Sequence, residues 1–345
     1  MAKKETNEKF KTMIGGQALI EGIMMMGPDK CATVVRNKEG IKTKVEPRKK
    51  TGKFSVKKIP FVRGIFNFCA SMKTGVSALM YSADVYAADE DEAPAEKQSK
   101  LDAWLEKKLS SEKAQSVVIT LAVVMGILFS VALFILLPSL LGEFIERWVT
   151  NDELIRNLLE GVLRIVIFLA YMFLISRMED MKRVFSYHGA EHKTIHCFEH
   201  GLALNAANAQ LFPTLHVRCG TAFLIMVMLI AIFVYTVLGA PINALVDLTG
   251  ITQGPLRFVL VVLTRILLMP VIAGVSYEIT VQWAGKRPNN PLVRVILWPG
   301  MQMQRLTTNP PDDSMVECAI AAMELVLARE ELEAAKKQDT AASAA

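Results

Sequence analysis

The sequence lacks the cysteine pattern of a disulfide-bonded secreted protein. Its cysteines are odd in number and scattered along the chain: Cys31, Cys69, Cys197, Cys219 and Cys318. Small secreted domains instead carry an even number of cysteines that pair with one another. The polar residues 1–12 are not followed by an apolar segment with a small-residue cleavage site, so we expect no cleavable signal peptide. We expect all five cysteines to be reduced thiols in or facing the cytoplasm.

Nucleotide-binding motifs and a strong charge bias are also missing. The segment 14–28 has four glycines and ends in a Gly-Pro pair, but it matches neither G-x-G-x-x-G nor a P-loop. We expect a shaped loop there, with short apolar pieces. The net charge is only +5, and Lys and Arg gather at the two chain ends and in one middle loop. This distribution indicates membrane topology and no nucleic-acid partner.

Long hydrophobic runs dominate what is present. The chain is 52% hydrophobic, and four runs have roughly the 18–21 residues that a hydrocarbon layer of about 30 Å requires. We expect four transmembrane helices, with Pro138 bending or ending the first, at about 117–137, 158–175, 221–238 and 258–277. The predicted fold class is a mainly α membrane protein, and its predicted partner is the lipid bilayer.

The orientation of these helices follows from the flanking Lys and Arg residues, which favour the cytoplasmic side. Basic residues are concentrated before the first helix (Lys100, Lys107, Lys108, Lys113), between the second and third (Arg177, Lys182, Arg183, Lys193, Arg218) and after the fourth (Lys286, Arg287, Arg294). The other two loops hold few. We therefore expect both termini and the loop 177–219 to be cytoplasmic.

Two arginines lie inside the predicted helices, where an unpaired charge is costly in lipid. Arg164 is expected to extend to the end of its helix. Arg265 lies deeper and is expected to pair with a carboxylate such as Asp247 or Glu278. A substrate path is an alternative for both, and simple structural pairing explains them equally well.

The remaining segments have distinct compositions. In order, we expect a disordered leader (1–12), a glycine-rich loop and β-hairpin (13–58), an amphipathic helix (59–86), an acidic linker with a short helix (87–115), the membrane domain (116–280), a cytoplasmic C-terminal segment (281–333) and a disordered tail (334–345).

Three of these segments carry specific expectations. The hairpin pairs 31–35 with 41–45. The helix 59–86 is too polar to span a bilayer, so it lies in the membrane interface or packs on the other helices. The C-terminal segment holds an apolar interfacial patch at 292–304 and a helix that a capping box from Ser314 to Glu317 opens.

Histidine is scarce, and its distribution is the most informative feature of the chain. Four of the five histidines follow one another at intervals of four residues (His188, His192, His196, His200), and the fifth is His216. Because residues four apart share one face of a helix, this spacing predicts a column of imidazoles with Glu191 at its border.

Residues 188–192 match the H-x-x-E-H pattern of inverted zincins. Two imidazoles one turn apart can bind Zn²⁺ or another divalent transition metal, and Glu191 can then act as a general base. We expect His188, His192 and His216 to be the ligands, since the loop 201–215 is long enough to return His216 to the helix. The reserve ligands are His196, Cys219 and Glu199.

Other interpretations of the column remain open. A hydrogen-bonded polar network without metal and a solvated, pH-responsive surface would both use the same residues. If a metal binds, catalytic and structural roles are both possible, and a Cys219 ligand would favour the structural one. Gly189 is unfavourable inside a helix, which places His188 either at the helix start or one turn before His192. We expect His200 to be a helix C-terminal residue without a ligand role.

Several motifs resemble the YqhQ-like family of bacterial multi-pass membrane proteins, which are often described as predicted metal-dependent enzymes. They are the segments 15–25, 187–193, 216–221, 276–278 and 304–313, and the resemblance covers about residues 12–327. It implies a location in the bacterial cytoplasmic membrane. It also implies that Gln17, Glu21, Arg218 and Arg305 belong to the site as substrate-binding or supporting residues. Val217 and Met26 depart from the family pattern without removing a candidate ligand.

Two functions follow from these observations. The first is a zinc-dependent hydrolase at the cytoplasmic membrane face, with Glu191 as the catalytic residue. The alternative is a non-enzymatic membrane assembly factor in which a metal or polar clamp only holds the loop. A transporter is less favoured, because the spans hold few charged residues besides Arg164 and Arg265 and no pair of broken helices occupies matching positions.

Overall fold

The computed structural model describes residues 14–48, 62–90, 112–148, 152–217, 219–251, 254–284, 287 and 290–327. The expected leader, the short helix within 87–115 and the expected tail lie outside these residues. The chain forms two compact units. The first comprises residues 1–90, 172–230 and 270–345, and the second comprises 91–171 and 231–269.

The first unit is built on a four-stranded antiparallel sheet in the order β1-β2-β3-β4. The expected hairpin is confirmed as β3 (Lys30–Asn37) and β4 (Gly40–Pro47). The expectation of a loop at 14–28 is wrong, because β1 (Gly15–Leu19) and β2 (Gly22–Met26) form a second hairpin there. Its glycines serve close packing: a Cβ on Gly22 would lie 2.4 Å from the Val34 carbonyl oxygen.

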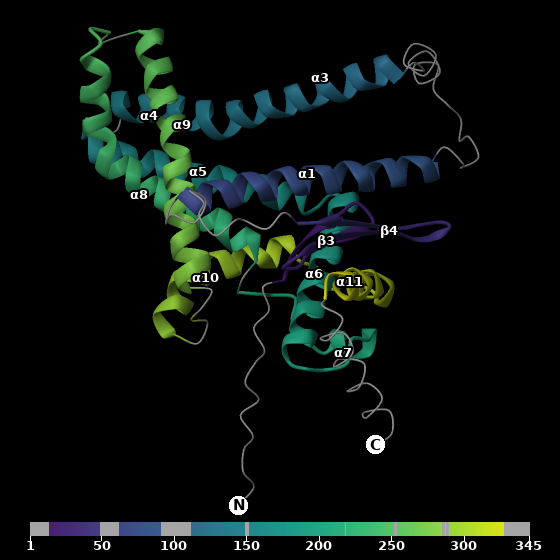
Figure 1. Cartoon of the computed structure of the whole chain (residues 1–345). Helices are drawn as coiled ribbons and strands as arrows, with labels where there is room; N and C mark the ends of the chain where they lie inside the picture. The colour runs from purple at the N-terminus through teal and green to yellow at the C-terminus, as the bar shows by residue number, and fades with distance from the viewer. Residues whose placement is uncertain are drawn as a thin grey trace, which may run out of the picture. The chain divides into compact units, whose positions relative to one another are not determined.

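Helices cover both faces of this sheet (Figure 1). One face packs on α1 (Val62–Glu90), with Ala78 against Leu19, Met24 and Cys31. The other face packs on α6 (Glu179–Glu199) and α11 (Asp313–Val326), and it forms the largest apolar core. This division follows from the strand repeat of two, since alternate residues of each strand face opposite sides.

The predicted amphipathic helix 59–86 is present as α1, and it continues to Glu90. Its packing on the sheet fits one of the two expected roles. Large apolar side chains on α1 nevertheless remain exposed, among them Phe66, Met72 and Val76. Contact of this helix with the membrane interface therefore stays a prediction.

The C-terminal segment contains α10 (Pro291–Thr307) and α11. The expected patch 292–304 lies on α10, where Leu292, Val295 and Trp298 are exposed. The expected capping box at Ser314–Glu317 is wrong, because the helix begins two residues earlier. The N-cap of α11 is Asp312, whose side chain accepts a hydrogen bond from the Met315 amide at 2.9 Å. Aspartate and serine compete for this role on nearly equal terms, so sequence alone does not choose between them.

Among the residues that the structure describes, four helical segments are long and apolar enough to span a membrane, as expected. They are Thr120–Gly142, Leu154–Ile175, Phe223–Asp247 and Pro255–Ala284. The helices concerned are α3 (Glu112–Val131), η2 (Ala132–Leu136), α4 (Leu137–Trp148), α5 (Glu153–Ile175), α8 (Gly220–Asp247), α9 (Pro255–Tyr277) and η3 (Glu278–Ala284).

Prolines interrupt these helices less than the sequence suggests. The first span continues through Pro138, which has no amide hydrogen to donate. The π-helical turn η2 lies just before it, and such a turn changes the hydrogen-bond pattern of the helix where the proline interrupts it. The third span was expected to end near residue 238, but α8 continues through Pro241 to Asp247. Apolar membrane-type helices tolerate internal proline when neighbouring groups compensate.

Arg265 pairs with a carboxylate, as expected, but with Glu160 and not with Asp247 or Glu278, and Arg164 pairs with the same residue in place of extending to the end of its helix. Arg164 and Arg265 both donate hydrogen bonds to one oxygen, Oε1 of Glu160, with Arg265 Nη1 at 2.5 Å. Ser139 donates to the same oxygen at 3.0 Å. Arg164 lies about 15 Å from either end of its span, which is too deep to reach water, and Glu160 is on the same helix face one turn away.

The carboxylates proposed for Arg265 bind other arginines. Asp247 pairs with Arg257 at 3.1 Å, and Glu278 accepts a hydrogen bond from Arg63 Nε at 2.7 Å. The second unit therefore contains a cluster of the buried Glu160 with the partly buried Arg164 and Arg265, with more positive than negative charge.

We expect Glu160→Ala to lower the free energy of unfolding by about 3 kcal/mol, because it leaves two partly buried guanidinium groups without their shared, buried carboxylate. Equilibrium unfolding in mixed detergent micelles measures this loss. Asp247→Asn, which removes a more exposed carboxylate from an arginine pair, is the matched control and should have little effect. Equal losses in both variants would contradict the structural importance of the cluster.

Candidate functional site

The histidine column lies on α6, a polar helix that the fold buries. Twelve of its residues are buried, including Glu191, His192, Lys193 and Glu199. His188 is in the helix interior, so the alternative placement at the helix start is wrong. Gly189 is required because another chain segment passes against the helix: a Cβ there would lie 2.1 Å from the Asn309 carbonyl oxygen. The Asn309 amide donates to the Phe185 carbonyl at 2.9 Å.

The chain after α6 folds back along the helix, as expected for the loop 201–215. It contains the short helix α7 (Ala206–Gln210) and then an extended segment leading to α8. Lys193 Nζ holds this return by donating to the carbonyls of Gln210 at 2.9 Å and Phe212 at 2.6 Å. Residues 214–217 and Cys219 are thereby placed beside the histidine column.

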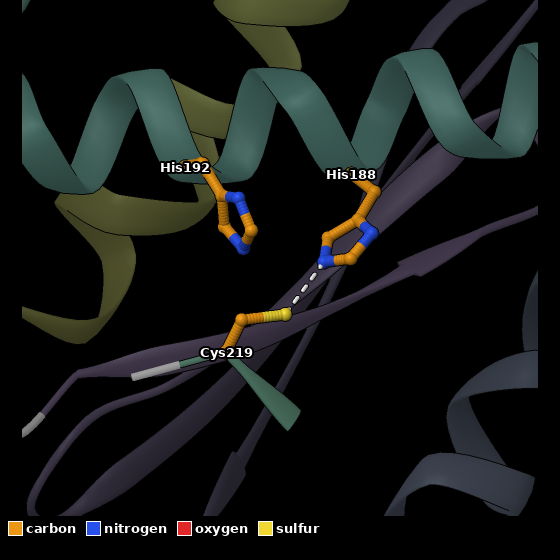
Figure 2. Close-up of side chains that lie close together, drawn as sticks. All are labelled: His188, His192 and Cys219. Atoms are coloured by element: carbon orange, nitrogen blue, oxygen red, sulfur yellow. Dashed lines mark hydrogen bonds between the residues drawn. The ribbon is translucent and has the colours of Figure 1, made fainter. Parts of the chain in front are cut away.

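His188, His192 and Cys219 form a group whose potential ligand atoms all lie within 4.8 Å of one another. Figure 2 shows the two imidazoles projecting from α6 toward the Cys219 side chain. His188 Nε2 lies 3.1 Å from Cys219 Sγ, and the two imidazole centroids are 4.4 Å apart. Three side chains of types that can bind a metal thus converge from two separate segments.

Backbone carbonyls fix the orientation of both imidazoles. Nδ1 of His188 donates to the Thr307 carbonyl at 2.7 Å, and Nδ1 of His192 donates to the Thr214 carbonyl. Because Nδ1 carries the proton, Nε2 of each ring presents its lone pair on the side of Cys219. Nε2 of His192 is buried and makes no hydrogen bond among the described residues. Metal-binding histidines in proteins are oriented by the same kind of carbonyl contact.

The protonation states of these groups suit metal binding. Burial lowers the pKa of His192, which keeps the imidazole neutral. Burial opposes ionisation of the Cys219 thiol, but the contacts that Sγ makes with the hydroxyl and the amide of Thr221 favour the thiolate, and the pKa of Cys219 is lowered. Thr221 Oγ1 lies 3.2 Å from Sγ. Cys219 also directly precedes α8, and a helix N-terminus favours thiolate.

Glu191 lies beside this group without being part of it. It is 5% exposed, and its Oε2 makes no hydrogen bond among the described residues. Burial raises the pKa of Glu191 to about 7; His188 and the Gly16 amide oppose this shift, and Cys219 adds to it. A Cβ on Gly16 would lie 2.9 Å from Glu191 Oε1, so the strand β1 leaves space for the carboxyl group.

His196, Glu199 and His216 form a second group with ligand atoms within 4.8 Å of one another. His216 Nε2 lies 3.6 Å from Glu199 Oε2. The structure therefore places His216 with two of the expected reserve ligands, and it places Cys219, another reserve ligand, with His188 and His192. The His192 and His216 ring centroids are 5.6 Å apart, so the two groups are neighbours.

Gln304 holds the returning segment, a role that the sequence analysis missed. Its Oε1 accepts from the His216 amide and its Nε2 donates to the His216 carbonyl, both at 2.8 Å. The carbonyls of Thr214 and Thr307 were missed as well, because a backbone acceptor has no side-chain signature. For Gln304, the only sequence signal was its place beside Arg305 in the segment 304–313, which resembles the family pattern.

The residues implied by the family resemblance lie elsewhere or outside the described chain. Gln17 packs against Gly75 of α1, on the sheet face opposite Gly16. Glu21 adopts a φ of 48° in the β1–β2 turn and accepts hydrogen bonds from Arg183 at 2.6 Å and Tyr187 at 3.3 Å. Arg305 is exposed on α10. Arg218 is outside the described residues.

His200 has a local role, in line with the sequence analysis. Its Nδ1 donates to the His196 carbonyl at 2.7 Å, at the end of α6. Neither group of potential ligands includes it. It therefore serves as a natural control for substitutions in the column.

Comparisons with known proteins fit the motif pattern. A family model described as "Protein of unknown function (DUF1385)" matches residues 59–329. The chain is also similar to the "Uncharacterized protein YqhQ" of Bacillus subtilis (strain 168), with 33% identity over 331 residues, covering 95% of this chain and 96% of that protein. No solved structure matches. The chain belongs to the DUF1385 family, and YqhQ is a relative of nearly the same length.

Proposed function

We propose that the protein is a metal-dependent hydrolase of the bacterial cytoplasmic membrane, with its site at the cytoplasmic face. The observation that carries the proposal is the paired orientation of His188 and His192. Each imidazole is held through Nδ1 by a backbone carbonyl, so that Nε2 is on the side of Cys219. Such oriented lone pairs, buried beside a thiol of lowered pKa, suit a metal better than a proton network.

The residues present fit zinc. Two imidazole nitrogens and a thiolate form a set that Zn²⁺ prefers, and the buried Nε2 of His192 lacks the partner that a metal would provide. Three protein ligands leave one coordination position open, as in catalytic zinc sites. A zinc ion held there would supply Lewis-acid chemistry to a water molecule or a substrate oxygen.

Glu191 is the proposed general base. A pKa of about 7 lets the carboxyl group accept and release a proton near neutral pH. The Gly16 amide and the space left by its missing side chain orient the carboxyl group. The unpartnered Oε2 remains available for a proton from water or substrate.

The alternative is a non-enzymatic membrane assembly factor with a structural metal clamp. It is favoured by the Cys219 ligand and by the way the site joins three segments: α6, the return loop and the end of α10. In this case Glu191 would have no chemical role.

The location rests on the flanking Lys and Arg residues. They favour cytoplasmic termini and a cytoplasmic position for α6. The exposed apolar side chains of α1 and α10 are suited to lipid contact at the same face.

We expect the full-length protein, purified in detergent, to contain zinc. His192→Ala and Cys219→Ala should each lower the content by about one equivalent per chain, since each removes a ligand of a three-ligand site. Metal analysis by mass spectrometry measures this, with His200→Ala as the matched control that keeps its metal. Unchanged metal content in the His192 and Cys219 variants would refute the site.

Glu191→Gln distinguishes the hydrolase from the assembly factor. The amide is isosteric with the carboxyl group but cannot accept a proton, so the hydrolase hypothesis expects normal zinc content and failure to complement a deletion strain. The assembly factor hypothesis expects normal zinc content and full complementation. Membrane levels of the variant, measured by immunoblot, control for loss of protein.

A further inference from the structure

We propose that His196, Glu199 and His216 form a second metal site beside the first, so that each chain binds two divalent transition-metal ions. The proposal goes beyond the proposed function, and it uses none of the three ligands assigned to the first site.

The three side chains converge from two segments. His196 and Glu199 are three residues apart and therefore share a face of α6. His216 reaches them from the return segment before α8, where it is 4% exposed. The His196 and His216 ring centroids are 4.6 Å apart, and His216 Nε2 is 3.6 Å from Glu199 Oε2. One ion could contact all three, because their ligand atoms lie within 4.8 Å of one another.

One imidazole of this group, that of His196, is also held by a backbone carbonyl. His196 Nε2 donates to the Leu215 carbonyl at 2.9 Å, which leaves the lone pair on Nδ1. The neighbouring carbonyl, that of Thr214, holds His192. Gln304 fixes the His216 backbone, and Phe212 stacks on the His196 ring at an interplanar angle of 15°. Four contacts therefore restrain the His196 ring and the His216 backbone.

The two groups differ in chemistry. The second offers two nitrogens and a carboxylate oxygen, which accommodate zinc, cobalt, manganese or iron, whereas the first contains a thiolate, which favours zinc. Burial lowers the pKa of His216 to about 4, so its ring is neutral and available to a metal at physiological pH. This difference in donors allows the two ions to be counted separately.

Titration of the metal-free, full-length protein with Co²⁺ tests the proposal. Cobalt bound to Cys219 produces a thiolate-to-metal charge-transfer band, and cobalt bound by His196, Glu199 and His216 does not. We expect two equivalents of cobalt per chain, of which only one produces the band. The ligand-field spectrum and equilibrium dialysis report the total.

Paired variants assign each equivalent. His196→Asn and Glu199→Gln should each reduce binding from two equivalents to one and keep the band. Cys219→Ser should abolish the band and leave the equivalent at His196, while His200→Ala should change neither. Circular dichroism and gel filtration verify that each variant is folded.

The outcomes separate this proposal from the first site. One equivalent with the band, insensitive to His196→Asn, would overturn the second site and leave the proposed function intact. One equivalent without the band, lost in His196→Asn, would support the second site and remove the metal at Cys219. No bound cobalt would overturn both.

Discussion

The structure of the first unit depends on satisfying the polar groups of a helix that has been removed from water. α6 places histidines, glutamates and a lysine in the interior, and an unpaired polar group there costs about 1–3 kcal/mol. The return loop and the end of α10 supply the missing partners through their carbonyls. The same hydrogen bonds that stabilise the fold therefore decide which side chains face one another.

Glycine makes this arrangement sterically possible. Gly189 lets the chain after α10 lie directly on α6, which brings the Thr307 carbonyl to His188. Gly16 lets the Glu191 carboxyl group sit against β1. In both places a methyl group would occupy space that backbone or carboxyl atoms now fill, so the site depends on residues that contribute no chemistry themselves.

Much of the fold could be predicted from local sequence patterns. Four apolar runs predicted the four spans, alternation predicted the β3–β4 hairpin, and a four-residue repeat placed Glu191 and three imidazoles on one buried helix. These features depend on neighbours in sequence, which the chain displays directly.

The rest depends on tertiary contacts. His216 and Cys219 are three residues apart in an irregular segment, and no periodicity says which of them meets His188. Glu160 lies one turn before Arg164, yet its second partner, Arg265, is on another helix. The glycines of the segment 14–28 suggested a loop, but Gly16 and Gly22 lie in strands. The space that their missing side chains leave is filled by a neighbouring strand or side chain.

The two consecutive carbonyls of Thr214 and Leu215 have a thermodynamic consequence. One holds His192 and the other holds His196, so two adjacent peptide units, joined at Leu215, connect the two groups of side chains. A ligand that shifts these peptide units at one group would change the orientation of an imidazole in the other. If both groups bind ligands, linkage requires that occupancy of the first alter affinity at the second by the same factor as the reverse. The return segment thus connects the two halves of the histidine column through adjacent backbone carbonyls.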